Sequence, residues 1–146
     1  MNNVAEIMVS YKPERVFDYK IENSRKSFEL VLDQWEKDRI QMQEEVKIIL
    51  LNRNNRALGI YSLASGGITS CIVDIRLILA VALKSLATGI IIVHNHPSGS
   101  LNPSNDDKKI TEQLKLACEL MGIDLLDHLI ITRDDYYSFA DEGLIC

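Results

Sequence analysis

The chain is poor in cysteine and proline, with three of each among its 146 residues. The cysteines stand far apart, at Cys71, Cys118 and Cys146, and form no C-x-x-C pair. An odd number of widely spaced cysteines argues against a disulfide framework. The pattern indicates reduced thiols, and we therefore expect a cytoplasmic protein.

The sequence also lacks the patterns of membrane segments, signal peptides and several common classes of enzyme. No apolar run approaches the roughly 20 residues of a membrane span, and residues 1–10 lack the basic and apolar regions of a signal peptide. Nucleotide-binding glycine loops, H-E-x-x-H and G-x-S-x-G are also missing. The formal net charge is -5, and the basic residues form no stripe, so nucleic acid is not the favoured partner.

The remaining composition is that of an ordinary globular domain, with 47% hydrophobic and 25% charged residues. Its apolar periodicity predicts a single-domain mixed β-sheet flanked by helices, of class α/β or α+β. Strands are expected at residues 6–12, 46–51, 56–64, 68–73, 89–94 and 123–132, and helices at 24–37, from Asp74 to Leu86 and from Ser104 to Gly122. Residues 1–40 are interpreted as a strand-helix appendage, anchored by Trp35, to a main domain of residues 41–146.

The sequence with the clearest chemistry is a histidine pair after an apolar strand, followed by an acidic helix start. His94 and His96 come directly after residues 89–93, and on an extended segment residues two apart face the same side. Ser104 is typical of a helix N-cap, which places Asp107 in the first helical turn. Two imidazoles, one carboxylate and an open fourth position describe a catalytic site for one zinc ion per chain.

Simpler interpretations of the same residues exist. The Ser104-x-x-Asp107 spacing is also that of a capping box. Asp106 is the alternative ligand, but it is expected to be a solvated acid favoured by the helix dipole. His128 is expected to be a partly buried sheet residue that makes a local hydrogen bond.

The pattern H-x-H-P followed by S-x-x-D resembles the JAMM/MPN (JAB1-type) metalloprotease motif, and the HNHPSG form resembles its RadC-like branch. The likeness extends over about residues 40–146 and implies a JAB/MPN-like, cytidine-deaminase-like architecture. It is also carried by Leu50-Leu51-Asn52-Arg53, Gly66-Gly67-Ile68, Val73-Asp74-Ile75-Arg76, Leu126-Asp127-His128-Leu129-Ile130 and Tyr137-Ser138-Phe139-Ala140.

The resemblance implies roles for further residues. Glu44 falls at the position of the family's general base, with Glu45 as the alternative, one residue later and on the opposite face. Ser104 falls at the position of an oxyanion-stabilising residue, and whether it caps the helix or serves the oxyanion stays open. Asn95 stands where many relatives have Ser or Thr; it is expected to point away from the metal and to affect substrate binding.

The resulting hypothesis is a zinc-dependent hydrolase of peptide or isopeptide bonds, acting on a protein or peptide substrate without a membrane partner. One alternative is a DNA-repair or DNA-processing factor of the RadC type. Another is a non-catalytic MPN-like binding module, against which the complete ligand set and the candidate base both count. The sequence does not predict the oligomeric state.

Overall fold

A mixed β-sheet forms the centre of the fold in the computed structural model, which describes residues 3–12, 18–66 and 73–145. The strand order is β2-β1-β3-β4-β5. β1 is antiparallel to both β2 and β3, and β3 is parallel to β4. The strands are β1 (Glu45–Leu51), β2 (Ala57–Ser65), β3 (Gly89–Asn95), β4 (Asp124–Ile131) and β5 (Tyr136–Ser138).

Three helices accompany this sheet in the described part of the chain: α1 (Ser24–Asp33), α2 (Ile75–Lys84) and α3 (Asn105–Leu120). α3 connects β3 to β4, because two parallel strands need a crossover between them. Its N-terminus therefore lies near the end of β3, where the histidines are.

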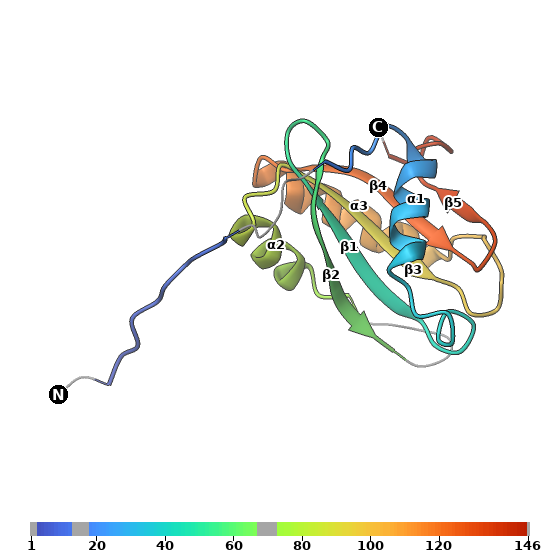
Figure 1. Cartoon of the computed structure of the whole chain (residues 1–146), viewed down its shortest axis with the longest axis horizontal. Coiled ribbons are helices and arrows are strands. Elements are labelled where there is room, and N and C mark those ends of the chain that lie inside the picture. Colours follow the sequence, from blue (N-terminus) through green and yellow to red (C-terminus); the bar gives the residue numbers. More distant parts are fainter. Residues whose placement is uncertain (1–2, 13–17, 67–72, 146) are drawn as a thin grey trace.

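The alternation of side chains along the strands divides the core into two layers. Ile48, Ile92 and Ile130 pack on one face with residues of α2 and α3. Ile49 and Ile91 pack on the other face with residues of α1. The helix α1 lies across this face of the sheet (Figure 1). The predicted fold class, a mixed sheet flanked by helices, is confirmed.

α1 is joined to this core by its apolar side. Phe28 and Val31 are buried with the sheet residues Ile49 and Leu129, and Trp35 is buried in the same cluster, as predicted. The helix ends at Asp33, with Gln34 as its C-cap, before the predicted end at residue 37. A division at residue 40 stays a prediction.

Of the other predicted strands, the one at residues 6–12 is wrong, and the one at 68–73 lies almost wholly outside the described residues. Residues 3–12 contain no strand, so the prediction at 6–12 is wrong, and Ile7 is 87% exposed. Alternation favours an extended chain, but a strand also needs a hydrogen-bonded neighbour, and this segment extends away from the domain (Figure 1). The strand predicted at 68–73 lies outside the described residues except for Val73, which belongs to no strand. No described helix has the length and hydrophobicity to span a bilayer.

Candidate metal centre

The two histidines are positioned by the end of β3. His94 pairs with Val46 on β1 and with Ile130 on β4, and only 3% of it is exposed. His96 follows the strand, and its backbone N–H donates to the carbonyl of Ile131 at 3.0 Å. The two rings lie in edge contact, and their Nε2 atoms are 3.0 Å apart.

Asp107 is positioned by the start of α3. Ser104 is the N-cap residue, and its hydroxyl accepts from the backbone N–H of Asp107 at 3.0 Å. The Asp107 carboxylate accepts in return from the backbone N–H of Ser104 at 2.8 Å, which completes a capping box. Ser104 therefore caps the helix, and this cap fixes the orientation of the Asp107 carboxylate.

Glu44 directly precedes β1 and lies two residues before Val46, on the same face of the sheet as His94. Its carbonyl accepts from the N–H of Gly66 at 2.8 Å. Glu45 is on the opposite face, where its carboxylate pairs with Arg39 at 3.3 Å. The structure thus places Glu44, not Glu45, beside the histidines.

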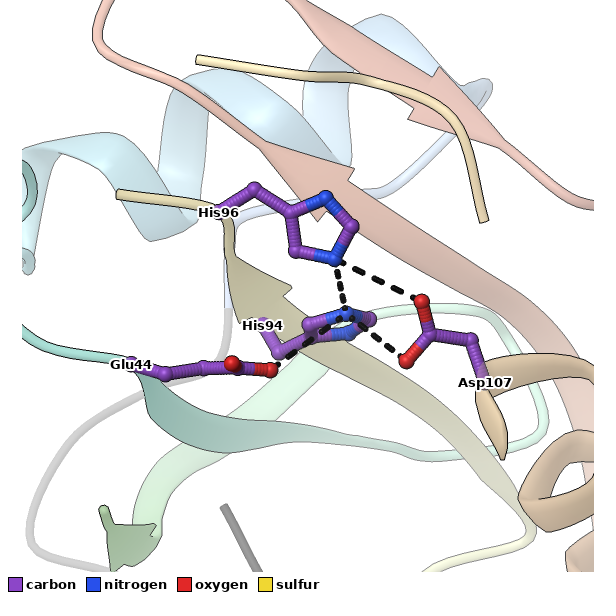
Figure 2. A group of neighbouring side chains, drawn as sticks. All are labelled: Glu44, His94, His96 and Asp107. Carbon is purple, nitrogen blue, oxygen red and sulfur yellow. Dashed lines mark hydrogen bonds and ion pairs between the residues drawn. The ribbon is translucent and has the colours of Figure 1, made fainter. Parts of the chain in front are cut away.

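Four side chains converge at this point (Figure 2). The Nε2 atom of His94 lies 3.2 Å from Oδ1 of Asp107 and 3.9 Å from Oε1 of Glu44. The Nε2 atom of His96 lies 3.4 Å from Oδ2 of Asp107. One ligand atom from each residue lies within 4.8 Å of every other, and Asp106 is outside this group.

The donor set fits a metal ion such as zinc. Nδ1 of His96 lies 2.7 Å from the carbonyl oxygen of Ser100, which has no hydrogen, so Nδ1 carries a proton, and in the neutral imidazole Nε2 presents a lone pair. The nearby carboxylates of Glu44 and Asp107 are also acceptors. Converging lone pairs repel one another unless a cation or a proton lies between them, and imidazole with carboxylate is a ligand set that zinc prefers.

The same proximity shifts the titration of these groups. Burial opposes ionisation of Asp107, but the adjacent imidazoles of His94 and His96 outweigh it and hold the pKa of this carboxyl well below its usual range. The hydrogen bond to Asp107 raises the pKa of His96. Burial raises the pKa of Glu44, and the imidazoles only partly offset this effect.

Asn95 lies between the histidines, on the opposite face of β3, and is fully buried. Its side-chain oxygen accepts from the backbone N–H of Glu45 at 2.7 Å. Its side-chain nitrogen donates to the carbonyls of Ile40 and Gln43, at 2.7 and 2.9 Å. Asn95 points away from the cluster, as expected. The expectation that it affects substrate binding does not suit a buried side chain; instead it holds the backbone on both sides of Glu44.

His128 is closer to the cluster than the sequence indicated. It is 1% exposed, and its Nε2 lies 2.8 Å from Nδ1 of His94. Its Nδ1 lies 2.6 Å from the hydroxyl of Thr111. Burial lowers the pKa of His128 well below its usual value. The expectation of a local hydrogen bond is therefore wrong, because His128 bonds to a residue of the neighbouring strand.

A cavity of about 130 Å³ adjoins the cluster. Glu44, His94 and Asp107 lie on its wall. Its other lining residues are mostly apolar and come from five elements or their ends: Val46, Val73, Ile92, Asp106, Ile110 and His128. A group that enters this cavity meets the candidate metal centre beside apolar side chains.

The fold and the cluster together define a mixed α/β domain with a candidate metal centre at one end of its sheet. A comparison with known protein families matches residues 21–144 to the RadC-like JAB domain. The chain belongs to this family, as the resemblance of its motifs indicated.

Individual relatives carry the name UPF0758 protein. That of Flavobacterium johnsoniae is 50% identical over 101 residues, which cover 69% of this chain and 44% of the relative. That of Aquifex aeolicus is 41% identical over 125 residues, which cover 86% of this chain and 52% of the relative. The chain thus spans about half the length of the curated relatives it matches.

Proposed function

We propose that this domain is a zinc-dependent hydrolase of peptide or isopeptide bonds. The observation that carries the proposal is the convergence of Glu44, His94, His96 and Asp107, with one ligand atom from each within 4.8 Å of the others. In this proposal His94, His96 and Asp107 hold one zinc ion per chain. When bound, zinc lowers the pKa of a water and polarises a carbonyl.

Glu44 is proposed as the general base and acid. Its carboxylate is farther from the Nε2 atom of His94 than that of Asp107 is, at 3.9 against 3.2 Å, which suits a group that acts beside the metal. Its raised pKa favours accepting a proton and then holding it until an amine leaves. Burial against the cavity wall keeps bulk water from competing for that proton.

Ser104 is proposed as the residue that stabilises an oxyanion. Its hydroxyl oxygen accepts from the backbone of Asp107, but the hydroxyl proton is free to be donated. One donor of this kind contributes roughly 2.7–4 kcal/mol to a transition state. Capping the helix and donating to substrate are therefore compatible for this side chain.

The widely spaced cysteines support a reducing, cytoplasmic location.

A protein or peptide chain is the proposed substrate. The net charge of -5 disfavours a polyanion. A single proposed metal position also suits an amide carbonyl, whereas phosphodiester cleavage more often uses paired metals.

The test incubates the zinc-loaded protein with a peptide library and, separately, with single- and double-stranded DNA. Peptide cleavage is expected, and Glu44→Gln should reduce it at least about 100-fold while zinc is retained. Glu45→Gln is the matched control and should remain active. Zinc-dependent DNA nicking that is lost in Glu44→Gln, without peptide cleavage, would establish a DNA-processing role instead. Zinc binding without any cleavage would identify a binding module.

A further inference from the structure

We infer that His128 and Thr111 form a directed hydrogen-bond chain that keeps Nε2 of His94 free of a proton and turned toward the metal position. The inference rests on the proposed zinc site and assigns positioning roles to two residues outside it. Three contacts show which atom carries each proton: Thr111 with the carbonyl of Asp107, His128 with Thr111, and His94 with His128.

The hydrogen-bond chain begins at Thr111, one helical turn after Asp107. The Thr111 hydroxyl oxygen lies 2.7 Å from the backbone carbonyl oxygen of Asp107. A carbonyl has no hydrogen, so the hydroxyl proton must lie in this contact. Thr111 has only this one proton to donate, and toward any other partner its oxygen acts as an acceptor.

His128 is that other partner. Its Nδ1 lies 2.6 Å from the Thr111 hydroxyl oxygen, so Nδ1 must carry a proton. His128 is buried and stacks on Phe139, with the ring centroids 4.4 Å apart. A neutral imidazole has one N–H, and its Nε2 therefore presents a lone pair.

His94 receives the end of this chain. Its Nδ1 lies 2.8 Å from the Nε2 of His128, and because the latter is an acceptor, the proton belongs to Nδ1 of His94. Nε2 of His94 is then the free nitrogen, and it is the atom that faces Asp107 and Glu44. Histidines that bind metals commonly donate their other N–H to a partner that fixes the ring in this way.

The hydrogen-bond chain joins two of the three proposed ligands, because it starts at the carbonyl of Asp107 and ends at the ring of His94. Without the Thr111 hydroxyl, His128 loses the acceptor for its Nδ1 proton and can carry that proton on Nε2 instead. His94 would then accept at Nδ1 and be protonated on Nε2, the atom that should bind metal. The loss of one hydroxyl is thereby transmitted to a ligand that it does not touch.

Long-range ¹H–¹⁵N NMR of the metal-free protein tests the direction of the chain. We expect protons on Nδ1 of both His94 and His128, with scalar coupling across the hydrogen bond between the two rings. A proton on Nε2 of His128 would overturn the inference, whatever the protein's affinity for zinc.

Competition with a chromophoric chelator tests its consequence. Thr111→Val keeps the branched shape and should weaken zinc binding about 10- to 100-fold, whereas Thr111→Ser keeps the hydroxyl and should bind like the unchanged protein. His128→Phe should weaken binding at least as much as Thr111→Val; if it fails to fold, the Thr111 pair decides. Equal zinc affinity in all folded variants overturns the inference and leaves the proposed function standing. A lack of zinc binding by the unchanged protein overturns both.

Discussion

The side-chain oxygen of Asn95 accepts a hydrogen bond from the backbone N–H of Glu45 across 2.7 Å, although the two residues are 50 positions apart in the sequence. This contact fixes the start of β1 against the end of β3. Glu44 and His94 belong to those two segments, so a buried amide on one face of the sheet sets the spacing of the candidate site on the other face.

Replacing Asn95 should therefore separate catalysis from metal binding. Asn95→Ala leaves the Glu45 amide and two carbonyls without their partner, and one unsatisfied buried group costs about 1–3 kcal/mol. We expect a loss of stability of at least this size and lower turnover, with zinc retained. Urea denaturation, metal analysis and peptide cleavage measure the three quantities. The exposed Asn102 supplies the control Asn102→Ala, and equal turnover in both variants would contradict this role for Asn95.

The zinc content of single variants checks the ligand set. His96→Ala should lose most of the metal that the unchanged protein holds, because one of three proposed ligands is removed. Asp106→Ala is the matched control, since this neighbouring acid lies outside the cluster and should leave the metal content unchanged. Elemental analysis after dialysis measures both, and full zinc retention in His96→Ala would refute the assignment.

Removing the Ser104 hydroxyl should affect both stability and rate. Ser104→Ala loses the helix cap and should lower the free energy of unfolding by about 0.5–2 kcal/mol. Turnover should fall as well if the hydroxyl stabilises an oxyanion. Ser104→Thr retains a capping hydroxyl and is the control for stability. A Ser104→Ala variant that is destabilised but turns over at the normal rate would restrict Ser104 to capping.

The pH dependence of the metal-free protein follows from the pair of Asp107 and His96. The pKa of Asp107 is lowered by folding, so its contribution to stability is present above its ordinary pKa of 3.8 and is lost at more acid pH. The pKa of His96 is raised, so its contribution is complete below 6.5 and is lost as pH rises through the folded-state pKa. The pair should therefore stabilise the metal-free protein most between about pH 4 and 6.5.

Thermal melting between pH 4 and 9 measures this effect, with Asp107→Asn as the reference. The melting temperature of the unchanged, metal-free protein should fall above about pH 6.5 relative to that of the variant. Parallel curves would exclude the pair as the cause. Zinc should reverse the trend, because its ligands must lose their protons before they bind.

Much of this arrangement could be predicted from the sequence because it is local. The spacing of His94 and His96 on a strand, and of Ser104 and Asp107 at a helix start, fixes the side chains relative to their own elements. The placement of Glu44 came from the family resemblance, and the structure agrees with it over Glu45.

The parts that the sequence did not predict depend on pairing between strands. In the parallel pair of β3 and β4, His128 lies opposite Ile92, two residues before His94, and only this register brings the two rings together. The sequence signal was His128 itself, a polar residue that follows Asp127 in a mainly apolar strand. Likewise, the role of Asn95 depends on its hydrogen bond to Glu45, which is 50 residues away in the sequence. The exposed segment at residues 3–12 shows that alternation of apolar residues alone does not make a strand.

All three proposed ligands, and the Thr111–His128 hydrogen bonds behind one of them, come from β3, the residue after it, α3 and β4, a single stretch from residue 94 to residue 128. Glu44 is attached to that stretch from outside, through the pairing of β1 with β3 and the contacts of Asn95. The proposed metal ligands and the proposed base Glu44 are thus held by different segments of the chain. A substitution at Asn95 is therefore expected to displace the proposed base while the proposed ligands keep their places.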